Sequence, residues 1–85
     1  MIDKATAKER IATNLRRLIA ARGWTVADLV RESHEAHNTV YRIIRGENVP
    51  DAVTLANLAD VLDTSIDRLL QDIPEKFSLK HKTSA

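Results

Sequence analysis

The chain has 85 residues, 44% of them hydrophobic and none of them cysteine, and its net charge at pH 7 is +1. This length fits one domain and not two, and the lack of cysteine excludes disulfide bonds and thiolate zinc sites. No apolar run approaches the roughly 20 residues that span a bilayer, and the charged N-terminal stretch is unlike a secretory signal, so we expect a cytoplasmic protein without a membrane partner.

The first predicted element is an amphipathic helix. Thr6, followed three residues later by Glu9, has the pattern of a capping box, which predicts that Thr6 caps the start of the helix. Apolar side chains then recur at the spacing of one helical face, at Ile11, Leu15, Leu18 and Ile19. Gly23 supplies the left-handed residue that commonly ends a helix.

Two short helices follow, separated by a tight turn. Thr25 is the expected cap of a helix over 26–32, and a second helix is predicted over 37–45, ending at Gly46. The inward positions of this pair are apolar: Val26, Leu29, Val30, Val40, Ile43 and Ile44. The outward positions of the second helix can all form hydrogen bonds, and none of them is acidic: His37, Asn38, Tyr41, Arg42 and Arg45.

The rest of the chain predicts two more helices and a polar end. Asp51 can cap a fourth helix, and Ser65 can cap a short fifth one. Their apolar stripes are Leu55, Leu58, Ala59 and Leu62 in the fourth helix and Ile66, Leu69 and Leu70 in the fifth. We therefore expect an all-α domain of five helices over residues 1–72, and a polar tail or linker over 73–85.

Charge is unevenly distributed along the chain. Residues 1–24 hold six Lys or Arg against two acidic residues, whereas residues 47–72 hold one Arg against six. This asymmetry is expected if one face meets a polyanion, and it is also compatible with ordinary solvated helix faces. For Arg16 and Arg17 in particular, both a solvated face and a contact to phosphate stay open.

The helix–turn–helix pattern suggests a way to read duplex DNA. The turn is too tight for the two helices to lie antiparallel, so the second one projects as a ridge that fits the major groove. Asn38 can pair with adenine, Arg42 with guanine or phosphate, and the amides after Thr25 can meet a phosphate. The candidate DNA-binding residues are Thr25, Val26, His37, Asn38, Tyr41, Arg42, Arg45 and Asn48.

Residues 23–70 resemble the Cro/repressor-type helix-turn-helix DNA-binding family. The matching motifs lie at matching spacings without a gap: Leu29-Val30, Thr39-Val40-Tyr41-Arg42-Ile43, Arg45-Gly46, Pro50, Leu58-Ala59 and Ser65-Ile66-Asp67-Arg68-Leu69-Leu70. The resemblance implies a compact five-helix, phage repressor-like fold. It also implies a sequence-specific transcriptional regulator, most often a repressor that acts by operator occlusion as a homodimer on a near-palindromic operator of double-stranded DNA.

The sequence departs from the family pattern at the turn and in the core. His34 and Glu35 stand where relatives usually have Gly and an apolar residue, and Ala36 replaces the usual hydroxyl cap of the recognition helix. Many relatives pair an Arg of the first helix with a Glu of the third. The matching positions here are Ile19 and Ile44, so we expect an aliphatic contact in place of a buried ion pair.

Other functions have less support in the residues. His34 and His37 are three positions apart but lack a convincing third metal ligand, so no metal site and no cofactor are expected. No constellation of nucleophile, base and oxyanion donors indicates an enzyme. The alternative that stays open is an antitoxin-like module that keeps this fold for binding a protein partner.

Overall fold

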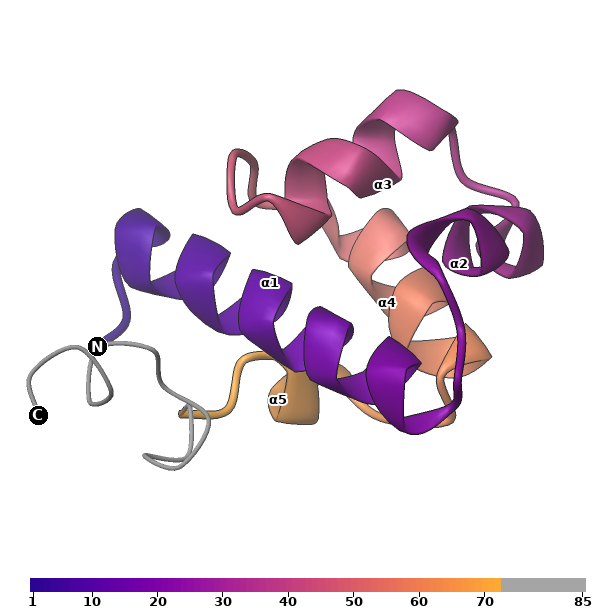
Figure 1. The fold of residues 1–85 in the computed structure, drawn as a ribbon. Helices are drawn as coiled ribbons and strands as arrows, with labels where there is room; N and C mark the ends of the chain where they lie inside the picture. The colour runs from indigo at the N-terminus through magenta and orange to yellow at the C-terminus, as the bar shows by residue number, and fades with distance from the viewer. Residues whose placement is uncertain (73–85) are drawn as a thin grey trace, which may run out of the picture.

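Five α-helices and no strand make up residues 1–72, the part of the chain that the computed structural model describes (Figure 1). The helices are α1 (Lys4–Ala21), α2 (Val26–Ser33), α3 (His37–Ile44), α4 (Ala52–Val61) and α5 (Ile66–Leu69). The predicted all-α architecture of five helices is therefore confirmed. The polar tail expected over 73–85 lies outside the described residues, and the domain boundary before it stays a prediction.

The start of α1 differs from the prediction. The Asp3 carboxylate accepts a hydrogen bond of 2.8 Å from the Thr6 amide, so Asp3 is the N-cap and the helix begins at Lys4. The prediction that Thr6 caps this helix was wrong. Two overlapping patterns with the same spacing, Asp3 to Thr6 and Thr6 to Glu9, compete here, and the earlier one adds three more residues to the helix.

The other predicted caps are present. Thr25 and Asp28 form a reciprocal capping box at the start of α2, with bonds of 2.8 and 3.2 Å. Asp51 and Ser65 accept hydrogen bonds from the third residue of α4 and of α5. Gly23 ends the first helix at φ +72°. Against the predicted ranges, α2 extends one residue further and α3 ends one residue earlier.

The core is aliphatic and joins all five helices. Its buried members are Ile11, Leu15, Ile19, Leu29, Val40, Ile43, Ile44, Leu55, Leu58, Ala59, Leu62 and Leu69. Ile19 of α1 and Ile44 of α3 are both only 6% exposed and belong to this cluster, as their apolar character predicts. α1 packs against α3 and α5 and lies between them (Figure 1), whereas α2 packs against α3 and α4.

Polar side chains on α1 and just after it donate hydrogen bonds to carbonyls at the ends of neighbouring helices. Arg16 donates to the Ile44 carbonyl at the end of α3, and Arg22 donates to the Leu62 carbonyl at the end of α4. The last carbonyls of a helix have no intrahelical donor, and cations there also oppose the negative end of the helix dipole. Two of the cations of residues 1–24 thus have a structural role inside the domain.

The end of α5 is held in the same way. Asn14 is fully buried, and its amide donates to the Leu69 and Gln71 carbonyls at 2.8 and 3.1 Å. Arg10 lies 3.3 Å from the Asp72 carboxylate, and Arg17 donates to the Asn14 side-chain oxygen at 3.2 Å. Neither interpretation of Arg17 from the sequence, a solvated face or a phosphate contact, anticipated this bond within the domain.

Candidate nucleic-acid interface

The turn between α2 and α3 begins with a residue in a left-handed conformation. His34 has φ +59°, and its amide donates to the Val30 carbonyl at 3.1 Å. This is the conformation that glycine adopts most easily, and a residue with a side chain takes it at some cost. At this position the chain therefore has histidine, where relatives usually have glycine, in a conformation that glycine favours.

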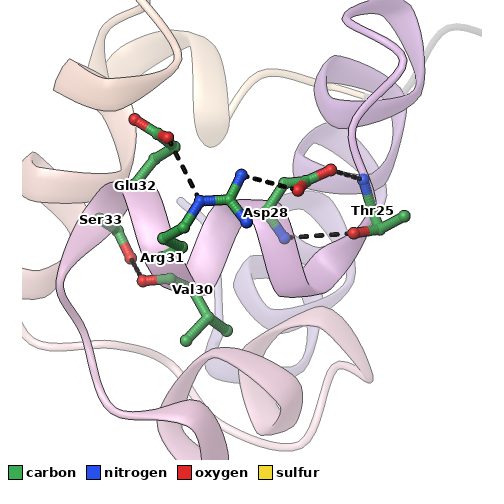
Figure 2. Close-up of polar contacts among 6 residues, drawn as sticks. All are labelled: Thr25, Asp28, Val30, Arg31, Glu32 and Ser33. Atoms are coloured by element: carbon green, nitrogen blue, oxygen red, sulfur yellow. Dashed lines mark hydrogen bonds and ion pairs between the residues drawn. The ribbon is translucent and has the colours of Figure 1, made fainter.

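The next residue of the turn reaches another helix. The Glu35 carboxylate accepts hydrogen bonds from the Asn57 amide at 2.8 Å and from the Thr54 hydroxyl at 3.4 Å, both on α4. The buried Ser33 hydroxyl donates to the Val30 carbonyl at 3.3 Å (Figure 2) and accepts from the Glu35 amide at the same distance. Sequence reasoning missed these bonds. The only signal was an acidic residue at a turn position that is apolar in relatives, with two polar residues three positions apart on α4.

The recognition helix α3 starts without a side-chain cap. Ala36 is its N-cap residue, and no side chain bonds to the first amides of the helix. A Ser, Thr, Asp or Asn at such a position typically stabilises a helix by about 0.5–2 kcal/mol. The start of α3 thus depends on the turn before it more than on its own cap.

The outward face of α3 matches the prediction. His37, Asn38 and Arg42 are exposed, and Tyr41 is half-buried. The His37 and Tyr41 rings stack with centroids 4.3 Å apart and planes inclined by 28°. Asn38 and Arg42 follow each other by one turn on this surface. Together these four residues present hydrogen-bond donors and acceptors beside a stacked aromatic pair. Donors and acceptors of this kind read base edges in the major groove.

The end of α3 carries a surface ion pair. Arg45 lies 2.8 Å from the Glu47 carboxylate, and both side chains are exposed. Exposed pairs of this kind contribute little to stability, so a phosphate can compete for the guanidinium. Asn48 is also exposed and lines an open depression of about 440 Å³ together with Lys4 and Lys8 of α1. These two lysines were not among the predicted site residues, because only the fold brings α1 beside this loop.

The start of α2 carries a negative charge as well as amide donors (Figure 2). The Asp28 carboxylate accepts from the Thr25 amide and from Arg31, each at 2.8 Å, and Arg31 also pairs with Glu32. Those hydrogen bonds, the Thr25 amide first, hold the pKa of Asp28 below its ordinary value. The amides near Thr25 and Val26 that were expected to bind a phosphate therefore lie beside a charged carboxylate, with Arg31 as the nearby cation.

Other kinds of site are not evident in the described part of the chain. Residues 1–72 contain no cluster of three or more His, Cys, Asp or Glu side chains that could hold a metal ion. None of the helices in this range combines the length and the apolar character needed to cross a membrane.

Comparison with known proteins agrees with the geometry. A family model described as a Cro/C1-type HTH DNA-binding domain matches residues 14–75. The crystal structure of the hypothetical transcription factor NHTF from Neisseria superposes with a TM-score of 0.74 at 21% identity, over 95% of this chain and 91% of that one. A search of curated proteins finds no match. On the family match, the chain belongs to the Cro/C1-type helix-turn-helix DNA-binding family and is a DNA-binding regulator rather than an enzyme.

Proposed function

We propose that this domain is a sequence-specific repressor that acts by occlusion, covering an operator and blocking access of the polymerase. The observation that carries the DNA-binding part of the proposal is the outward face of α3, on which four neighbouring side chains can hydrogen-bond and none is acidic: His37, Asn38, Tyr41 and Arg42. An acidic or apolar face would favour the alternative, an antitoxin-like module that binds a protein partner. The domain would act in the cytoplasm, where it can bind bacterial or phage DNA.

In this proposal the residues divide into base readers and phosphate contacts. Helix-turn-helix domains insert the N-terminal end of the recognition helix deepest, so His37 and Asn38 lie nearest the base edges and Tyr41 and Arg42 one turn behind. Asn38 is suited to adenine and Arg42 to guanine. The phosphate contacts flank this face: Thr25 and Val26 at the start of α2, and Arg45 and Asn48 after α3.

The proposed active form is a homodimer on a near-palindromic operator. Two such domains bind half-sites about one helical turn apart, roughly 34–36 Å between centres. In the last helix, Leu69 is fully buried and belongs to the monomer core, whereas Ile66 and Leu70 are half-buried. Ile66 and Leu70 are therefore the apolar residues of this segment that remain accessible for a dimer contact.

Selection of bound sequences from a random duplex pool tests the proposal. We expect one enriched motif with an inverted repeat, and sedimentation of the complex with two chains per duplex. In a reporter assay, the motif placed over a promoter should lower transcription when the chain is expressed. An enriched motif that raises transcription would contradict repression, and a motif without a repeat would contradict the dimer.

A further inference from the structure

One side chain connects the turn of the helix-turn-helix to α4. The Glu35 carboxylate receives the Asn57 amide at 2.8 Å and the Thr54 hydroxyl at 3.4 Å, across 22 and 19 positions of sequence. Hydrogen bonds to a charged acceptor are roughly twice as strong as those between neutral groups. This contact therefore joins the turn, which lies just before α3, to a helix outside the motif.

The local chemistry of the turn is otherwise weak. His34 takes a left-handed conformation without being glycine, and Ala36 gives α3 no side-chain cap. Ser33 ties the Glu35 amide back to α2 at 3.3 Å, but this bond does not relate α3 to the rest of the domain. The two hydrogen bonds that Glu35 accepts from α4 thus connect this turn to α4.

We propose that Glu35 is a positioning residue for DNA recognition: it fixes the entry end of α3 relative to α4 and so determines which base pairs α3 reads. The second half of this statement rests on the proposed function. Glu35 itself is not assigned a DNA contact, because both of its carboxylate oxygens are engaged by α4 and its charge would repel a phosphate.

Four variants separate the hydrogen bonds from the charge. Glu35→Ala removes both bonds and one negative charge, whereas Glu35→Gln removes the charge but keeps an oxygen for Asn57 and an amide for Thr54. Asn57→Ala removes one bond from the α4 side, at an exposed position where folding is not at risk. Asp60→Ala is the matched control, because it removes an exposed carboxylate from α4 near Asn57 and leaves both bonds to Glu35 in place.

The first measurement needs no DNA. Residual dipolar couplings of the backbone amides give the orientation of α3 relative to α4 in the free protein. We expect Glu35→Ala and Asn57→Ala to change this orientation, and Glu35→Gln and Asp60→Ala to match the wild type. An unchanged orientation in both Glu35→Ala and Asn57→Ala would overturn the proposal, whatever their effect on stability.

The second measurement is the ratio of affinities for the selected operator and for a scrambled duplex. Asn57→Ala should lower this ratio about tenfold, the effect of losing one charged hydrogen bond, and Glu35→Ala, which removes both bonds, should lower it at least as much. If the orientation of α3 changes in these variants but the ratio of operator to scrambled-duplex affinity does not, Glu35 does not influence DNA recognition. If the wild type itself prefers no sequence, the proposed function fails, and the couplings still decide whether Glu35 positions α3.

Discussion

The Asn14 amide, buried in α1, donates to the Leu69 carbonyl of α5 at 2.8 Å, across 55 positions of sequence. The same amide reaches the Gln71 carbonyl at 3.1 Å. A single side chain of the first helix thus supplies donors to the end of the last one. This bond holds the closing segment of the described domain onto α1.

Asn14→Ala should destabilise the domain by about 1–3 kcal/mol, because it leaves the buried Leu69 carbonyl without the Asn14 donor. Denaturation by urea, followed by circular dichroism, measures the free energy of unfolding. Asn48→Ala is the matched control, since Asn48 is exposed and its loss should change stability by no more than about 0.5 kcal/mol. Equal stabilities of the two variants would show that the Asn14 bonds do not support the fold.

Ile19→Ala and Ile44→Ala should each cost roughly 2–5 kcal/mol, because both side chains are buried in one apolar cluster. Val53→Ala removes an exposed side chain of α4, 70% of whose surface is accessible, and should be nearly neutral. Thermal unfolding of these three single variants and of the Ile19 and Ile44 double variant gives the comparison. If the double variant of Ile19 and Ile44 costs the simple sum of the two, the residues are not in direct contact.

Stability should fall in acid through the three aspartates whose carboxylates accept backbone hydrogen bonds at the starts of helices. Backbone hydrogen bonds from Thr6, Thr25 and Thr54 hold the pKa values of Asp3, Asp28 and Asp51 below the ordinary carboxyl value. Because the folded pKa is the lower one, this stabilisation is complete above the unfolded pKa of about 3.9 and is lost as the pH falls through the folded pKa.

Unfolding measured between neutral pH and about pH 2 tests this dependence. Asp28→Asn should flatten the acid limb of the curve, whereas Asp60→Asn, at an exposed position near the end of α4, should leave it unchanged. An identical acid limb in wild type and Asp28→Asn would contradict the assigned role of the Asp28 carboxylate.

Binding to duplex DNA should weaken steeply with salt, because phosphate contacts release counterions. Arg45→Ala should lower affinity for all sequences about equally and reduce the log–log salt slope by about 0.9. Fluorescence anisotropy at several salt concentrations measures the slope. If the salt slope of Arg45→Ala equals that of the wild type, Arg45 of the wild type does not contact a phosphate and stays paired with Glu47 in the DNA complex.

The helices and the core could be predicted because their signals are local. Thr25 and Asp28 lie three residues apart, and the apolar residues of α1 repeat at the helical period, so neighbouring residues were enough. The start of α1 was missed because two cap patterns overlap. The bonds of Arg16 to α3 and of Arg22 to α4 join residues 28 and 40 positions apart and exist only once the helices pack.

In the candidate site, too, some features follow from local sequence signals and others from long-range packing. The outward face of α3 follows from the helical period alone, whereas the Glu35 contact depends on where α4 lies. Lys4 and Lys8 reach the loop near Asn48 only because α1 packs beside α3. Long-range geometry of this kind has no periodic or motif signal in a single sequence.

Selection from a random duplex pool with wild type and Asn38→Ala tests whether α3 reads bases through its N-terminal half. We expect Asn38→Ala to lose preference at one base pair in each half-site and to bind the wild-type motif more weakly by about 1–3 kcal/mol. An Asn38→Ala variant that selects the same motif with the same preference at every position would contradict this role of α3.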